Sequence, residues 1–358
     1  MTVVFNALSS VVRAFLIAVA LILSTVRLGN ALVDMQNANY TNTWIDVTEK
    51  LGVSVLRTYN SRSLFDGMFG FGWCSKFETS IAFNDRDSFE LSFCGGGASL
   101  EFEPQQRSEG PGRVLTAQDG STLEVSAQRF VYRSADGKET LHFDRMGHVS
   151  GIETSGFGTV EIIRRYGRII EIVDWEDRRY RFSTNSAGKV LRIHTPDDLL
   201  IEYRYNHYGD LVAVKNAWRN VYTFFYDDEH NLIRATWPDK TFIAIDYDKE
   251  KDWVVGFVDR DLCKEAYKQG FSVRENEVYW VYSTRRCGEE LTAEGLYEFI
   301  YTKDSSSGRG RLWKVRVSAG LSGPSGVNFT ETVYPEFGPP IVTREKRDGL
   351  HTPLLMPM

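Results

Sequence analysis

Histidines and paired acidic residues are the side chains in this sequence that could perform acid–base or metal chemistry. Pairs such as Asp197-Asp198 and Asp227-Asp228 could offer oxygen ligands to calcium, but the EF-hand spacing is missing and aspartate also forms turns by binding nearby backbone amides. No histidine belongs to a His-Glu-x-x-His or Gly-x-Ser-x-Gly pattern. We therefore expect no catalytic residue, no metal and no cofactor, with calcium left open. The histidines are His142, His148, His194, His207, His230 and His351.

Four cysteines form two local pairs, separated by 20 and 24 positions: Cys74 with Cys94, and Cys263 with Cys287. In an exported chain such an even set predicts two disulfides, 74–94 and 263–287. Zinc is the alternative, but there is no Cys-x-x-Cys and no histidine beside any cysteine. Loops of this size, once closed, stabilise a fold by about 3 kcal/mol each.

Aromatic residues could form a binding surface, since exposed tryptophan and tyrosine stack on sugar rings or anchor protein partners. The candidate ligand-binding residues are Trp175, Trp218, Trp237 and Trp253. The alternative is cross-strand packing, because aromatic side chains at a period of two commonly fix the register of a sheet.

The N-terminal residues 1–31 resemble a secretory signal. They carry Arg13 and Arg27, no acidic residue, and an apolar run from Ala14 to Leu23 that is short for a membrane helix. Gly29 and Ala31 supply the small residues expected before a cleavage site, although an uncleaved anchor is the alternative. Cleavage would leave 40 basic and 48 acidic residues, a net charge of −8. The mixed charge argues against nucleic acid, and no later segment could span a membrane.

A repeat of 20 to 21 residues organises the middle of the chain. Gly147, Gly167, Gly188 and Gly209 each precede an apolar residue by two positions, and the pattern continues at His230 and Lys251 without the glycine. An aromatic residue stands shortly before each turn, as in Tyr205-Asn206 and Tyr226-Asp227. Each unit therefore predicts a β-hairpin, and neighbouring hairpins must stack into a sheet because one alone cannot bury its face.

The units Tyr205-Asn-His-Tyr-Gly-Asp-Leu and Phe225-Tyr-Asp-Asp-Glu-His-Asn-Leu resemble the YD repeats of the Rhs family, which read Tyr-Asp-x-x-Gly-x-Leu. The stretch 55–62, followed by Phe69-Gly-Phe-Gly-Trp73, is similar to the segment that opens the Rhs repeat region. The resemblance covers about residues 50 to 258. It implies a spiral sheet of hairpins, which in long Rhs proteins forms a hollow shell around a C-terminal toxin. With about eight units and no Asp-Pro-x-Gly-Leu core motif, this chain should form only an arc, a bowl or a small capped sandwich.

These patterns predict an all-β protein with five segments. They are a signal peptide at 1–31, an opening β module at 32–135, YD-type repeats at 136–258, a Cys-stapled insertion at 259–298 and terminal repeat-like strands at 299–358. The insertion is expected to be a loop that interrupts the repeats, with a short helix at 262–269.

The function predicted from these features is that of an exported structural or interaction scaffold, periplasmic, at the cell surface or secreted. Its sheet edges would pair with a protein partner or with other copies of the chain, or its surface would bind a polymer. The alternatives are a carbohydrate-binding adhesin and a toxin-associated effector held in the stapled segment.

Overall fold

The protein is described by a computed structural model for residues 33–47, 53–84, 88–93, 99–103, 113–273, 277–302, 312–319, 328–334, 342–347 and 350–354. The predicted signal peptide and Cys94 lie outside these residues. Within them, no helix is long and apolar enough to cross a membrane. The predicted all-β class is confirmed, since strands joined by turns make up nearly all of the described chain, with one short 3-10 turn, η2 (Lys76–Glu78).

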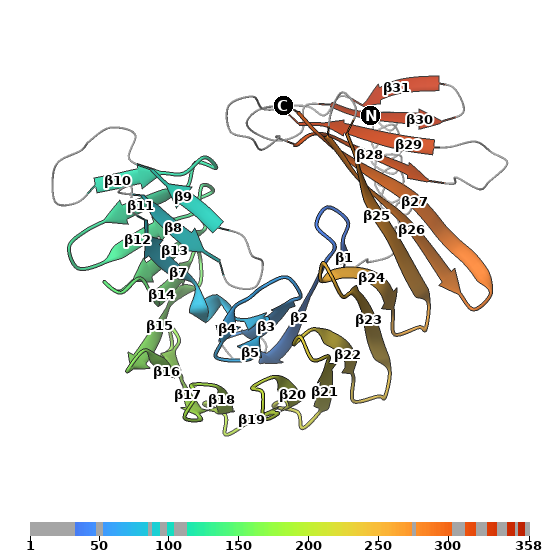
Figure 1. Ribbon diagram of the computed structural model, residues 1–358. Helices are drawn as coiled ribbons and strands as arrows, with labels where there is room; N and C mark the ends of the chain where they lie inside the picture. Colours follow the sequence, from blue (N-terminus) through green and yellow to red (C-terminus); the bar gives the residue numbers. More distant parts are fainter. Residues whose placement is uncertain are drawn as a thin grey trace, which may run out of the picture.

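One antiparallel sheet of 22 strands forms the frame, and each strand pairs with the next in sequence. It curls into an open arc that begins at β10 and ends at β31 (Figure 1). Its strands are β10 (Arg113–Thr116), β11 (Thr122–Val125), β12 (Phe130–Arg133), β13 (Glu139–Phe143), β14 (Val149–Thr154), β15 (Gly158–Arg165), β16 (Arg168–Val173), β17 (Arg179–Thr184), β18 (Val190–His194), β19 (Leu200–Tyr205), β20 (Leu211–Lys215), β21 (Val221–Tyr226), β22 (Leu232–Thr236), β23 (Phe242–Asp248), β24 (Trp253–Val258), β25 (Lys264–Val273), β26 (Glu277–Cys287), β27 (Glu290–Tyr301), β28 (Leu312–Ala319), β29 (Asn328–Val333), β30 (Val342–Arg347) and β31 (Leu350–Leu354).

The 21-residue period corresponds to one hairpin of this sheet. The turn between its two strands needs a residue with positive φ, which glycine adopts without steric cost. Gly188 and Gly209 have φ of 86° and 93°, and His230 takes the same conformation at 67°. In the next hairpin the residue with positive φ is Asp252, at 53°, one position after the Lys251 that the repeat predicts.

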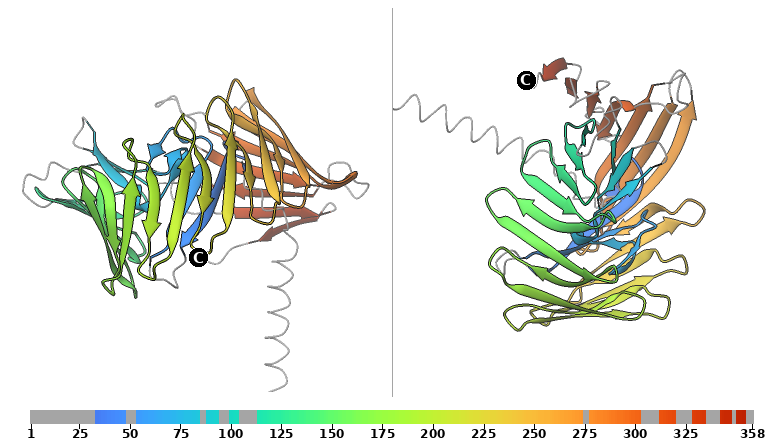
Figure 2. Two further views of the ribbon diagram at one scale, coloured as in Figure 1. Left: turned by 90° about the horizontal axis from the view of Figure 1, so that it is seen from below. Right: turned by 90° about the vertical axis from the view of Figure 1, so that its left-hand side faces the viewer.

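The opening module lies against the inner face of the arc, as two views at right angles show (Figures 1 and 2). The strands before β10 form a four-stranded sheet in the order β1-β2-β3-β6, the pair β4-β5 and the three-stranded sheet β7-β8-β9, whereas β10 to β12, within the expected range 32–135, begin the large sheet. The name opening module is used below for β1 to β9. Module and sheet share one continuous hydrophobic core. The strands are β1 (Val33–Asp34), β2 (Asn39–Val47), β3 (Val55–Asn60), β4 (Asp66–Gly67), β5 (Gly70–Phe71), β6 (Trp73–Cys74), β7 (Ser80–Phe83), β8 (Phe89–Ser92) and β9 (Ser99–Phe102).

In the described part of the segment 259–298, the strands β25, β26 and β27 continue the sheet, where the sequence indicates an interrupting loop. The helix expected at 262–269 is wrong, because this stretch enters β25 and pairs along ten residues with β26. Alternate side chains explain the difference: Glu265 and Tyr267 are buried, whereas Lys264, Ala266 and Lys268 are exposed. This alternation is the period of a strand.

Candidate functional site

Hydrogen bonds join the opening module to the repeats along a line of contact that we call the seam. Each hairpin has a β-bulge at this line. Between β19 and β20 the register shifts at Arg204/Tyr205, and Tyr205 pairs with Leu211. A bulge leaves backbone groups outside the regular ladder. The Tyr226 hydroxyl, from the next hairpin, donates to the Leu211 carbonyl at 2.9 Å.

The same bond recurs along the array at a sequence separation of 15. Tyr205 donates to the Val190 carbonyl at 2.8 Å, and Tyr247 donates to that of Leu232 at 3.2 Å. At the two ends other side chains replace tyrosine. Arg164 donates to the Val149 carbonyl, and Gln269 donates to that of Val254 at 2.9 Å. The tyrosine of the repeat therefore links consecutive hairpins through their bulges.

The module uses the amides of these same bulge residues. Val149 N donates to the Thr79 carbonyl at 3.3 Å, Val190 N to that of Met68 at 2.8 Å, and Val254 N to that of Ala38 at 3.1 Å. Leu232 N donates to the Tyr59 hydroxyl at 2.9 Å. The module is thus attached to four of the hairpins through their bulge amides, three times by a backbone carbonyl and once by a tyrosine hydroxyl.

A buried ion pair lies at the centre of the seam. Arg57 Nε and Nη2 donate to the Asp46 carboxylate at 2.6 and 3.0 Å, and the Tyr203 hydroxyl donates to Asp46 at 2.7 Å. All three side chains are almost fully buried. Burial and the neighbouring Asp46 raise the pKa of Tyr203 well above its ordinary value, so the phenol stays protonated. The arginine also lies 4.8 Å from the centre of the Trp73 ring.

Sequence reasoning assigned no role to this network. Its partners are 11 and 157 positions apart, so no local pattern joins them. The feature of the sequence that could have indicated the network is Arg57 itself. It lies between Val55 and Tyr59 on the buried face of β3. A charged residue on an apolar face needs a buried partner.

The four predicted tryptophans do not share one surface. Trp175 and Trp218 lie in turns between hairpins and are 41% and 51% exposed. Trp237 is partly buried, with its ring 6.1 Å from that of Trp44. Trp253 begins β24 and packs against Phe271 and Tyr279. Two of the four therefore belong to the packing of the fold, and the other two are separated by two hairpins.

Acidic residues and histidines of the repeats lie mainly at the turns. Asp227 accepts hydrogen bonds from the amides of Glu229 and Asn231, and Asn206 repeats this arrangement in the preceding hairpin. His230 contacts Asp210 at 2.6 Å. The described residues contain no group of three or more His, Cys, Asp or Glu side chains arranged to hold a metal ion.

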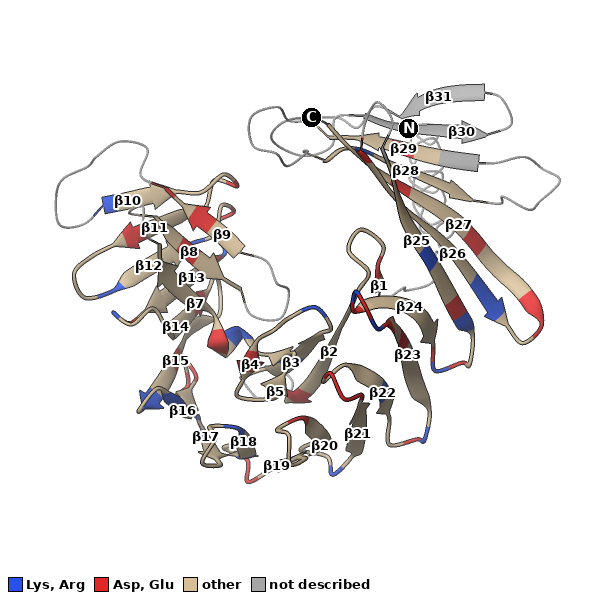
Figure 3. Ribbon diagram, viewed as in Figure 1, with Lys and Arg blue, Asp and Glu red and all other residues tan. Residues whose placement is uncertain are grey.

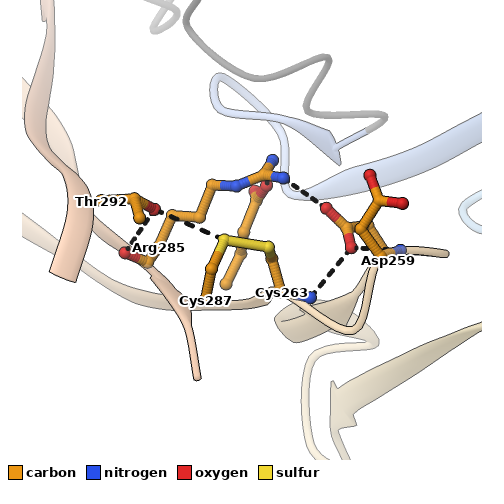
Figure 4. Close-up of a disulfide and its surroundings, with 7 residues drawn as sticks. Asp259, Cys263, Arg285, Cys287 and Thr292 are labelled. Carbon is orange, nitrogen blue, oxygen red and sulfur yellow. Dashed lines mark hydrogen bonds and ion pairs between the residues drawn. A yellow bond between two sulfur atoms is a disulfide. The ribbon is translucent and has the colours of Figure 1, made fainter. Parts of the chain in front are cut away.

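A disulfide joins Cys263 and Cys287, with their Cα atoms 4.3 Å apart (Figure 4). It connects the residue before β25 to the last residue of β26, where the strands of the sheet become long. Beside it Arg285 forms ion pairs with Asp259 and Glu265, the latter at 3.0 Å. The expected partner of Cys74 is Cys94, which is outside the described residues, so that pairing stays a prediction.

Both ends of the large sheet are strand edges. In the described part of the chain, β10 pairs only with β11 and β31 pairs only with β30. Lys and Arg positions are interspersed with Asp and Glu positions along the coloured part of the sheet (Figure 3). The feature that the edges at β10 and β31 share is a backbone with one unpaired side.

Comparison with known proteins finds one family model that matches part of the chain. No curated protein matches the sequence. Among solved structures, the TcdB2–TccC3 complex matches at 10% identity with a TM-score of 0.35, over 89% of this chain and 24% of that one. A Tc holotoxin pore of Photorhabdus luminescens matches at 9% identity with a TM-score of 0.28, over 83% and 20%. The chain thus spans about a quarter or less of these structures. Residues 32–102 match the model of a domain of unknown function, DUF6531, which covers the opening module.

Proposed function

We propose that this protein is an exported, Rhs-like scaffold whose open sheet edge pairs with another polypeptide, either a partner protein or a second copy of the chain. The observation that carries the proposal is the unclosed 22-stranded sheet. An edge strand presents unpaired N–H and C=O groups, and such an edge is a template for pairing with a further strand. The scaffold acts by binding and performs no reaction of its own.

The edge at β10 is better suited to pairing than the edge at β31. β31 contains Pro353, opposite Arg344, and proline has no N–H to offer a neighbouring strand. β10 contains no proline, and its Val114 side chain is 62% exposed. We therefore assign the docking edge to β10.

Export is supported by cysteine chemistry. The Cys263–Cys287 disulfide lies at the base of two long strands, and structural disulfides of this kind persist in oxidising compartments. The periplasm, the cell surface and the extracellular medium all meet this condition.

Light scattering of the purified chain under oxidising conditions tests the proposal. We expect a defined oligomer, or a complex with a co-purifying protein, whose mass depends on protein concentration. A monomer at every concentration, with no bound protein, would contradict the proposal and would mean that the edges are covered within the chain.

A further inference from the structure

A cavity of about 380 Å³ lies in the seam between the opening module and the hairpin β15–β16. Its wall combines the module residues Asp66 and Glu78 with Arg164, Arg168 and Lys189 of the repeats. The volume is within the range of about 300 to 1,000 Å³ that is usual for small-molecule sites. The seam thus contains a space large enough for a ligand of the size of a monosaccharide.

The cavity lies beside the bulge of the hairpin β15–β16, between two bulges that are bonded to the module. Val149 N is bonded to Thr79 and Val190 N to Met68, and both belong to bulges. The hairpin between them has the same bulge, with Arg164 opposite Ile169. Ile169 lines the cavity, and among the described residues its amide makes no bond to the module. The cavity therefore lies between two hairpins whose bulge amides are both bonded to the module.

The positive charges around this space exceed the negative charges. Arg164 donates to the carbonyls of Val149 and Phe77, and Arg168 to those of Asn185 and Ser186. Asp144 and Glu78 lie close enough to Arg164 to act on it electrostatically, whereas the bonds of the Arg168 guanidinium in the described part of the chain go to carbonyl oxygens. Each guanidinium has five N–H donors, so the carbonyl bonds leave further donors available.

The two carboxylates of the wall do not cancel this charge. Asp66 is paired with Lys189. Glu78 accepts hydrogen bonds from Met68 N at 2.5 Å and Ser75 N at 3.2 Å. Burial raises the pKa of Glu78 to about 7, so this carboxyl is partly neutral at neutral pH. Arg164 is balanced in part by Asp144 and Glu78, which act on it electrostatically. The three cations of the wall still outnumber its two carboxylates, and the guanidinium of Arg168 carries the excess charge.

We propose that this cavity binds a small molecule bearing an oxyanion, such as a sugar acid or a sugar phosphate, with Arg168 and Arg164 as the groups that recognise the anion. Guanidinium groups bind carboxylate and phosphate oxygens through short charge-assisted hydrogen bonds. The apolar side chains of Met68, Ile169 and Val190 provide a surface for the uncharged part of the ligand. This site is independent of the sheet edge at β10.

Isothermal titration of the full mature chain with glucuronate, glucose 6-phosphate and glucose tests the site. We expect at least one of the two anions to bind in the millimolar range or more tightly, more weakly as salt increases, and glucose not to bind. Preference for one anion identifies the oxyanion that the cavity takes. Failure of both anions to bind at millimolar concentration would overturn the proposal.

Variants test whether binding occurs in this cavity. Arg168→Gln removes an exposed guanidinium and should weaken binding about tenfold or more. Ala187→Phe leaves every charge in place but fills the mouth of the cavity, and it should abolish binding. Arg192→Gln is the matched control, because Arg192 is exposed on β18 and does not line the cavity. Thermal unfolding checks that each variant is folded, and unchanged affinity in both test variants would refute the site.

Discussion

Tyrosine hydroxyls link consecutive repeats through hydrogen bonds. Tyr205, Tyr226 and Tyr247 each donate to a bulge carbonyl of the preceding hairpin, and burial raises the pKa of each phenol. A protonated phenol is a donor at every physiological pH. The tyrosine of each of these repeat units is therefore explained by a hydrogen bond as well as by its ring.

The change Tyr226→Phe should lower the free energy of unfolding by about 2 kcal/mol. The hydroxyl donates to the Leu211 carbonyl and accepts from Trp73 Nε1 at 2.8 Å, so its removal leaves two buried groups without a partner. Urea titration followed by tryptophan fluorescence measures the loss. Tyr222→Phe on the same strand is the control, because its hydroxyl makes no bond to a described residue, and an equal loss in both variants would refute the explanation.

Glu78 should make stability depend on pH. Its pKa is raised from 4.5 to about 7 by burial, so between these values the folded chain binds more protons than the unfolded chain. The free energy of unfolding therefore falls as pH rises through this range. Because the side chain is partly exposed, we expect a loss of about 2 kcal/mol between pH of about 5 and about 8.

Urea unfolding at both pH values, for the wild type and for Glu78→Gln, isolates this contribution. The glutamine variant has no proton to lose at this position and should show a smaller fall in stability. A pH dependence identical in the two proteins would show that other groups cause it.

Among the elements, the disulfide at the base of β25 and β26 should stabilise the long strands. Removing it in the double variant Cys263→Ser/Cys287→Ser should lower the free energy of unfolding by about 3 kcal/mol, because the closed loop spans 24 positions. Urea titration under oxidising conditions measures the difference. The difference should disappear when both proteins are fully reduced, and its persistence there would mean that the serines themselves disturb the packing.

The hairpins could be predicted from the sequence because their determinants are local. Gly188 and Gly209 mark turns that need positive φ, and the aromatic residue before each turn lies at a fixed position. The strand β25 was missed because the repeat spacing ends there, and the strands lengthen to 10, 11 and 12 residues in β25, β26 and β27. Its alternation of buried and exposed residues is not visible in the sequence, because the buried positions include the charged Glu265 and the exposed ones include Ala266.

The seam could not be predicted in the same way, since its contacts join distant segments. Asp46 meets Tyr203 only after the module has packed on the sheet, and Met68 reaches Val190 across 122 positions. The cavity depends on which bulge amides the module binds, and this has no signature in the repeat. The sequence predicts each hairpin, whereas the packing of the module decides which bulges it contacts.

At the scale of the whole molecule, the open arc leaves β10 as a strand with one free side, and a single substitution can test its role. Ala117 N bonds to Ser121 O beyond the end of β10, and hydrogen-bonded pairs alternate along an antiparallel ladder. Val114 and Glu124 therefore form a non-hydrogen-bonded pair, so the N–H and C=O groups of Val114 point away from β11. Val114→Pro removes an N–H from the free edge and leaves the internal ladder intact.

We expect Val114→Pro to reduce the mass of the assembly to that of a monomer, with thermal stability close to that of the wild type. Val114→Thr keeps the N–H and should assemble normally, which separates the backbone effect from that of the side chain. Light scattering over a series of protein concentrations measures the mass, and circular dichroism checks the fold. Assembly that survives in the proline variant would exclude β10 as the docking edge and direct attention to β31, where Pro353 leaves fewer donors for a partner strand.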